Sequence, residues 1–251
     1  RLEYQTSGAL AQTYAAGGEY DRAIELLKRM LESEVAREDE MLRASALSNL
    51  GVAYGRKGAA AEGLPFAREG YEIRVRRAPK DPITHNTGWQ LGISYMENGR
   101  LDDSVDVLER TYAAASEASG PDHSDVLAGV VLLNYARARR GDGAGVLAPM
   151  RESIARQRET GVPLAQVAQS RMYLAGALLL AVAGEEAVAE ADAAVAEVAA
   201  ATSACDRAVV TVLLQVGTIF SAYGGARESL AYLERAFECT KSQPAVAALA
   251  P

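Results

Sequence analysis

The sequence has few aromatic residues, and this shortage limits the kind of core it can form. Only 6% of the 251 residues are aromatic, although 49% are hydrophobic. A core must therefore consist mainly of Ala, Leu and Val. Sheets favour aromatic and β-branched residues, whereas Ala and Leu are strong helix formers. The composition favours helices packed closely on helices.

Cysteine is almost absent, and Cys205 and Cys239 have no spacing typical of a metal site. Two cysteines without a recognisable signal peptide indicate a reducing compartment, so we expect a cytoplasmic protein. We interpret both as small core residues. The sequence starts at Arg1 rather than Met, which suggests a fragment whose upstream signals are not visible.

Long apolar runs and excess positive charge are also missing. The longest apolar run lies between Arg171 and Glu185, whereas a membrane-spanning helix needs about 20 apolar residues. The formal net charge is -7, and phosphate binding requires a concentrated basic surface. We therefore expect neither a membrane nor a nucleic-acid partner, although a local positive patch remains compatible with this total.

Motifs for catalysis are missing as well. His85 and His123 lie near connecting segments, away from any nucleophile signature, and we find no phosphate loop, dinucleotide fingerprint or paired-histidine metal motif. The sequence thus predicts no catalytic residues, no metal and no cofactor. A catalytic site assembled from scattered residues is the alternative.

What the sequence does contain is a repeat. Residues 50–54 read LGVAY and residues 91–95 read LGISY, each followed four residues after the tyrosine by a glycine. Glycines that we assign to turns between paired helices recur every 40 to 43 residues, at Gly18, Gly58, Gly99, Gly141, Gly184 and Gly224. Repeats of this length indicate units that bury their apolar faces by stacking on each other.

Each unit also shows the apolar pattern of two packed helices. A bulky or long residue precedes each turn glycine by four positions, namely Tyr14, Tyr54, Tyr95, Arg137, Leu180 and Phe220. After the glycine, apolar residues recur at helical spacing, as in Ala23, Leu27 and Met30, Val105, Leu108 and Tyr112, and Leu230, Leu233 and Phe237. These stripes predict buried faces.

From residue 5 to residue 240 the sequence resembles the tetratricopeptide repeat family, which has Leu-Gly and then Tyr in the first helix of each unit. The long period resembles the kinesin-light-chain subset, and the composition suggests a bacterial source. The resemblance implies an all-α, right-handed superhelical α-solenoid. We expect one array of six antiparallel helix pairs, at residues 4–34, 44–77, 84–118, 124–158, 167–201 and 206–240, with a tail at 241–251.

Members of this family bind peptides or proteins in a concave groove lined by the first helices. The family pattern places these groove residues here at Gln12, Ser45, Ser48, Asn49, Arg56, Asn86, Trp89, Gln90, Met96, Glu97, Tyr135, Arg139, Arg171 and Gln215. Asn49, Gln90 and Gln215 share one register, where amides can hold a peptide main chain. Alternatively, they are solvated or bridge neighbouring hairpins.

Trp89 and the arginines leave alternatives open. Trp89 lies one residue past the usual aromatic position, so it is either a groove anchor or a core residue that fills the space left by Gly88. Arg56, Arg139 and Arg171 could converge on an acidic ligand. The basic run at residues 74–77 is interpreted as a solvated helix end.

The sequence therefore predicts a non-enzymatic scaffold that binds a protein or peptide in its groove. The alternatives are a regulatory domain of a larger bacterial signalling protein and a module that self-associates through its C-terminal end. In the latter region, we expect the apolar tail to cover the last helix as a cap.

Overall fold

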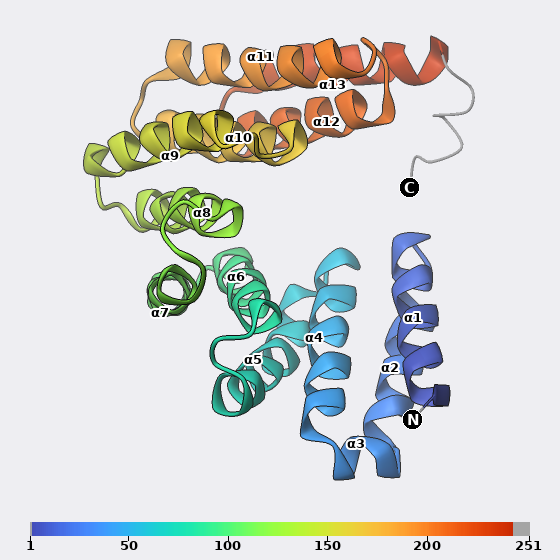
Figure 1. Ribbon diagram of the computed structural model, residues 1–251. Helices are drawn as coiled ribbons and strands as arrows, with labels where there is room; N and C mark the ends of the chain where they lie inside the picture. Colours follow the sequence, from blue (N-terminus) through green and yellow to red (C-terminus); the bar gives the residue numbers. More distant parts are fainter. Residues whose placement is uncertain (1, 243–251) are drawn as a thin grey trace. The chain divides into compact units, whose positions relative to one another are not determined.

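The computed structural model describes residues 2–242, which form helices joined by turns and short connectors and contain no strand (Figure 1). In chain order the helices are α1 (Leu2–Ala16), α2 (Tyr20–Glu32), α3 (Glu34–Glu38), α4 (Glu40–Arg56), α5 (Ala60–Arg77), α6 (Pro82–Glu97), α7 (Leu101–Ser119), α8 (Ser124–Arg140), the 3-10 helix η1 (Ala144–Val146), α9 (Leu147–Glu159), α10 (Leu164–Leu180), α11 (Gly184–Ala201), α12 (Arg207–Ala222) and α13 (Ala226–Ser242). The predicted all-α class is confirmed.

The helices form two compact units, residues 1–118 and residues 119–251. We call them the N-terminal unit and the C-terminal unit. The paired helices lie close to the predicted repeat boundaries, for example α4 and α5 over residues 40–77 and α12 and α13 over residues 207–242. One continuous array stays a prediction, and the predicted cap formed by the tail falls outside the described residues.

The first helices of three pairs begin with the same kind of N-terminal cap. Asp39, Asp81 and Asp206 precede α4, α6 and α12, and each carboxylate accepts a backbone N–H of the first turn at 2.8–3.1 Å. Such caps satisfy donors that the helix itself leaves unpaired. These caps fix the residue at which each of the three helices begins.

The turns within the pairs follow one backbone rule, with one exception. Gly18, Gly58, Gly99, Gly141 and Gly224 adopt φ between 70° and 100°, a region that favours glycine. In the fifth pair this position is Val182, with φ 60°, whereas Gly184 is already the first residue of α11. The turn assigned to Gly184 was therefore wrong, and the buried residue four positions before the turn is Leu178 rather than the 38% exposed Leu180.

Glycines inside the helices permit close packing of the two members of a pair. A Cβ added to Gly51 would lie 2.8 Å from Cβ of Ala67 on the paired helix, and one added to Gly88 would overlap Thr111. Real Cβ atoms do not approach so closely, and overpacking a filled core costs free energy. These glycines therefore set the separation of the helices.

The last helix differs from its prediction. In the second helix of the first pair, the stripe of Ala23, Leu27 and Met30 is buried as predicted. On α13, by contrast, Leu230, Leu233 and Phe237 are 57%, 37% and 59% exposed. The buried residues of α13 instead include Tyr232, Ala236 and Cys239.

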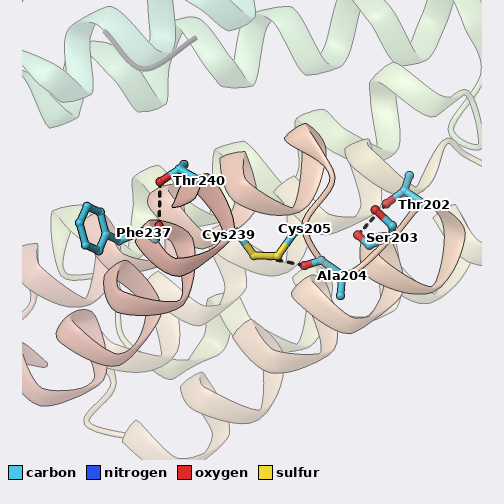
Figure 2. Close-up of a disulfide and its surroundings, with 7 residues drawn as sticks. All are labelled: Thr202, Ser203, Ala204, Cys205, Phe237, Cys239 and Thr240. Atoms are coloured by element: carbon cyan, nitrogen blue, oxygen red, sulfur yellow. Dashed lines mark hydrogen bonds between the residues drawn. A yellow bond between two sulfur atoms is a disulfide. The ribbon is translucent and has the colours of Figure 1, made fainter. Parts of the chain in front are cut away.

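The two cysteines are joined, contrary to the interpretation as unpaired core residues. Cys205 precedes α12, Cys239 lies in the last turns of α13, and their sulfurs form a disulfide across 34 residues of sequence (Figure 2). Spacing along the chain did not indicate this pair because the two positions meet only after the helices fold back. Disulfides persist in oxidising compartments, so the cysteine content no longer supports a reducing one.

Candidate binding groove

An open groove lies in the N-terminal unit, on the side of the first helices. It has a volume of about 310 Å³ and is lined by six of the predicted site residues, Gln12, Ser45, Ser48, Asn49, Asn86 and Gln90. These residues come from α1, α4 and α6, which are the first helices of three consecutive pairs. Helical register therefore brings together side chains that are up to 78 positions apart in the sequence.

A second hollow of about 350 Å³ shares Gln12, Asn49 and Val52 with the groove and adds Arg56 to its lining. Gln12 Nε2 donates to Asn49 Oδ1 at 3.5 Å, so this amide pair bridges neighbouring hairpins. The amides of Asn86 and Gln90, in contrast, are exposed and make no hydrogen bond within residues 2–242. The alternative of solvated or bridging amides thus applies in this structure, and the binding of a peptide main chain by them stays a prediction.

Arg74 is the charged residue of the groove lining, although it belongs to the second helix α5. Its side chain is 5% exposed, Nη2 donates to Ser45 Oγ at 2.8 Å, and Nε is buried without a hydrogen-bond partner. Burial lowers the pKa of Arg74, and the charge of Asp81 opposes this effect only in part. The interpretation of residues 74–77 as a solvated helix end is therefore wrong for Arg74.

The register of α5 explains this position. Gly63, Ala67 and Gly70 form the face that packs on α4, and a Cβ at Gly70 would lie 2.8 Å from Ser48 Oγ. Arg74 follows Gly70 by four residues, so it continues along the same helix face. Sequence reasoning grouped it with Arg76 and Arg77, which are exposed, and overlooked the small-residue stripe. Arg77 pairs with Glu40 at 2.6 Å.

Two other predicted groove residues of the N-terminal unit belong to the core. Trp89 is 7% exposed and Met96 is 3% exposed, so neither can anchor a ligand in this conformation. In the part of the chain that the structure describes, Trp89 Nε1 has no hydrogen-bond partner. Its neighbour Gly88 contributes no side chain because α7 and Tyr71 occupy that space. Glu97 is exposed at the end of α6.

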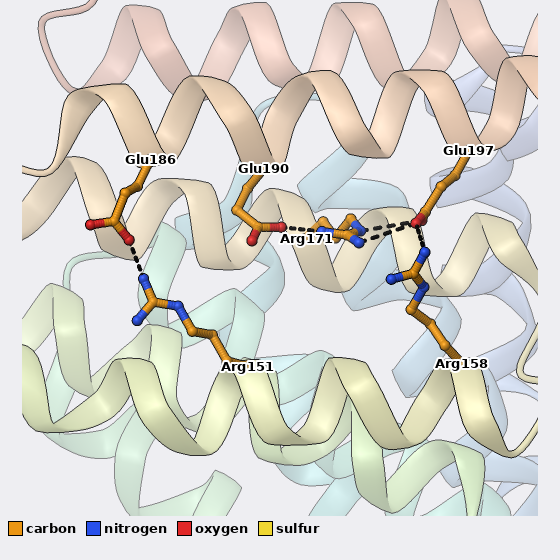
Figure 3. Close-up of polar contacts among 6 residues, drawn as sticks. All are labelled: Arg151, Arg158, Arg171, Glu186, Glu190 and Glu197. Atoms are coloured by element: carbon orange, nitrogen blue, oxygen red, sulfur yellow. Dashed lines mark hydrogen bonds and ion pairs between the residues drawn. The ribbon is translucent and has the colours of Figure 1, made fainter.

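In the C-terminal unit, Arg171 makes internal ion pairs. It is 9% exposed and pairs with both Glu190 and Glu197 of α11, as Figure 3 shows. Glu197 also pairs with Arg158 of α9 at 2.6 Å. Burial by itself would lower the pKa of Arg171, but hydrogen bonds and charges of the two glutamates raise it. Its guanidinium is therefore held by protein carboxylates rather than free for a ligand.

Tyr135 is likewise occupied within the C-terminal unit. It is 8% exposed, its hydroxyl shares a 2.8 Å hydrogen bond with the Tyr223 hydroxyl, and its ring lies 5.0 Å from that of Tyr173. Burial, together with the bond to Tyr223, raises the pKa of Tyr135. Of the remaining predicted residues, Arg139 is half-buried and Gln215 is exposed on α12.

The structure was also searched for metal-binding groups and membrane-spanning helices. Among residues 2–242, no group of three or more His, Cys, Asp or Glu side chains is arranged to hold a metal ion. None of the helices described in the structure combines the length and the apolar character needed to span a bilayer.

Family comparisons agree with the repeat pattern. Tetratricopeptide-repeat models match residues 6–41 and residues 90–125. A kinesin light chain of Podosopora anserina with nearly identical TPR-like repeats is similar in fold, with 20% identity, a TM-score of 0.63, and 80% of this chain and 97% of that chain covered. No curated protein sequence gives a significant match.

Two Rap structures are also similar. The apo form of RapI has 14% identity and a TM-score of 0.73, with 96% of this chain and 84% of that chain covered. The Rap conjugation gene regulator of the plasmid pLS20, in complex with the Phr* peptide, has 12% identity and a TM-score of 0.61, with 95% and 62% covered. At these identities the likeness concerns the fold. Together with the two matched repeats, it shows that the chain contains tetratricopeptide repeats within a fold of stacked helix pairs.

Proposed function

We propose that the protein is a non-catalytic scaffold that binds a peptide or an extended protein segment in the groove of its N-terminal unit. The observation that carries this proposal is the convergence of polar side chains from α1, α4 and α6 on one open groove. Amides such as Asn86 and Gln90 supply both donors and acceptors, which suit a peptide main chain of any sequence.

The comparisons support this proposal at the level of the fold. A Rap protein of similar fold is described in complex with the Phr* peptide, and stacked helix pairs provide long surfaces for such ligands. The same likeness supports the alternative of a regulatory domain within a signalling protein. A regulatory domain can use the convex face or the ends of the array instead, so the experiment on the groove tests the scaffold proposal.

That experiment selects displayed random dodecapeptides on the immobilised native chain and measures the affinity of the enriched peptides. The groove variant carries Gln12→Ala and Gln90→Ala, and the matched control carries Gln5→Ala and Gln169→Ala, two exposed glutamines outside the groove lining. We expect the groove variant to bind the peptides about tenfold more weakly, because each lost hydrogen bond contributes about 1 kcal/mol. Equal binding by both variants would refute the groove.

Self-association is a second candidate function, and the exposed apolar stripe of α13 favours it. Leu230, Leu233 and Phe237 lie on one face of that helix and are each more than a third exposed. A second copy of the chain could cover this face. Sedimentation velocity would then show dimers that a Leu230→Ser, Phe237→Ser variant lacks, whereas monomers for the native chain would exclude it.

A further inference from the structure

We infer that the C-terminal unit has a binding site of its own, a small apolar pocket that takes a lysine or arginine side chain of a partner protein. The pocket has a volume of about 330 Å³ and lies where the turn between α10 and α11 meets the turn between α12 and α13. It shares no residue with the groove of the N-terminal unit. The inference is therefore independent of the proposed function.

The first step is the apolar lining. Leu179, Val188 and Phe220 line the pocket from α10, α11 and α12. The volume is at the lower end of the range of about 300–1,000 Å³ for ligand sites, so it suits one long side chain. Walls of this kind contact the methylene groups of lysine or arginine, while the charged end of the side chain stays near water.

The second step is the charge of the lining. Its charged residues are Glu185 and Glu228, and it includes no lysine, arginine or histidine. Glu228 is half-buried. Within residues 2–242 neither of the two carboxylates has an ion pair or a hydrogen bond. The neighbouring Glu186, in contrast, pairs with Arg151 (Figure 3). Two negative charges of the pocket are therefore left without a cation.

The third step is the contribution of the helix ends. Glu185 and Glu228 lie in the first turns of α11 and α13, where the partial positive charge of the helix N-terminus favours a carboxylate. The C-termini of α10 and α12 lie at the same edge, because each turn joins the end of one helix to the start of the next. Helix ends carry about +0.5 and −0.5 of an elementary charge, so the four ends cancel. The charges of the two glutamates remain, and they favour a cation.

The fourth step is the kind of cation. Calcium and magnesium ions take about six or more oxygen ligands, whereas among the described residues no group of three or more His, Cys, Asp or Glu side chains could hold a metal ion. Two carboxylates beside apolar walls suit an organic cation with an aliphatic chain.

The fifth step is the surface around the pocket. Val182 lines the pocket with a side chain that is 93% exposed, and Leu180, two residues before it, is 38% exposed. In the part of the chain that the structure describes, Val182 is also the one non-glycine residue with positive φ, and strain of this kind is often retained at binding sites. A protein surface can cover these apolar side chains, whereas a free amine cannot.

The test selects displayed random dodecapeptides on the native chain and discards those that also bind a Glu185→Gln, Glu228→Gln pocket variant. The matched control, Glu159→Gln, Glu234→Gln, changes the net charge equally at two exposed positions of the C-terminal unit outside the pocket lining. The best peptide is synthesised with its basic residue and with norleucine in that place, which keeps the aliphatic chain without the charge. Fluorescence anisotropy measures the affinities, and circular dichroism shows that each variant is folded.

We expect the selected peptides to share a lysine or arginine at one fixed position. The norleucine peptide should bind the native chain at least about tenfold more weakly, since hydrogen bonds between charged groups contribute more than neutral ones. The pocket variant should not distinguish the two peptides, whereas the control should. In a nitrogen–proton correlation spectrum the peptide should shift the amide signals of the glycines that line the pocket, Gly184, Gly224 and Gly225.

Val182→Gly gives a second measurement that does not alter the carboxylates. Removal of this exposed apolar side chain should weaken peptide binding about threefold, because part of the apolar contact is lost. The melting temperature should not fall, since glycine adopts positive φ without strain. A variant with unchanged affinity would remove Val182 from the site and with it the argument for a protein partner.

The contrary outcomes separate this site from the groove. Equal affinity for the basic and the norleucine peptide, or a selection in which no peptide depends on the two glutamates, would overturn the inference. Peptides that bind the Gln12→Ala, Gln90→Ala groove variant more weakly and leave the three glycine signals unchanged would also overturn it, but would support the proposed function. If N-acetyl-lysine methylamide bound as tightly as the peptide, the pocket would be a site for small amines and the protein partner would be refuted.

Discussion

Arg74 in the N-terminal unit and Arg171 in the C-terminal unit are both buried, at 5% and 9% exposed, but their partners differ. Arg171 pairs with Glu190 and Glu197, which follow it by 19 and 26 residues. Within residues 2–242, the one hydrogen-bond partner of the Arg74 guanidinium is the hydroxyl of Ser45. The residues on the facing helix therefore decide whether a buried arginine of the array is neutralised by carboxylates of the protein.

The two units differ in the same way at other positions. In the N-terminal unit, Asn86 and Gln90 remain exposed in an open groove. In the C-terminal unit, Tyr135 bonds to Tyr223, and a disulfide links Cys205 to Cys239. Internal bonds stabilise the C-terminal unit and occupy groups that could otherwise contact a ligand. Four variants can test this contrast.

The largest effect is expected from Arg171→Met. The change removes the cation that Glu190 and Glu197 share, and only Glu197 keeps a second partner, Arg158, while the two glutamate side chains are only 24% and 16% exposed. Breaking a buried ion pair by removing one partner typically costs about 3–5 kcal/mol. We therefore expect a loss of this size in the free energy of unfolding, measured by urea titration with circular dichroism. The same change at Arg74 should cause no loss, and equal losses at both sites would remove the contrast.

The disulfide should give the next largest effect. Its 34-residue separation closes a loop in the unfolded chain, and loss of a cross-link of this size costs about 2–4 kcal/mol. A Cys205→Ala, Cys239→Ala variant should therefore melt at a lower temperature than the native chain. Addition of a reductant should lower the native melting temperature to that of the variant and leave the variant unchanged. A native melting temperature that is insensitive to reduction would contradict the stabilising role.

Much of the fold followed from the sequence, because helix pairing depends on local features. Five of the six predicted turn glycines and the stripe of Ala23, Leu27 and Met30 are visible in the sequence and match the structure. The candidate binding groove could be predicted from the sequence less completely than the fold. Whether Trp89 faces the groove or the core depends on how closely α7 approaches Gly88. The partners of Arg171 lie on α11, whereas Arg171 itself lies on α10. Such contacts between helices leave no simple spacing in the sequence.

Gly88→Ala tests the close packing of the N-terminal unit. The added Cβ would overlap Thr111 and lie 2.9 Å from Cε2 of Tyr71, so α6 and α7 must separate. Overpacking of this kind costs about 1–3 kcal/mol, and we expect a loss of that size in the urea titration. Gly145→Ala is the matched control, because nothing lies within 4 Å of its Cβ position. A Gly88→Ala variant as stable as Gly145→Ala would show that this helix pair adjusts freely.

The smallest effect, and the only expected gain, comes from Val182→Gly. Val182 occupies with φ 60° the turn position where Gly18, Gly58 and Gly99 occur in the N-terminal unit. A β-branched residue is strained in the left-handed region, and its side chain is 93% exposed, so little packing is lost on its removal.

Relief of this strain, reduced by the greater flexibility of glycine in the unfolded chain, should raise the free energy of unfolding by about 0.5–1 kcal/mol. The reverse change, Gly58→Val, should lower it, because it introduces the same strain at a turn with φ 83°. Urea titrations of the two variants measure both signs. If Val182→Gly were destabilising, the exposed valine would have to make contacts in solution, and the fifth turn would then differ from the others by more than its residue type.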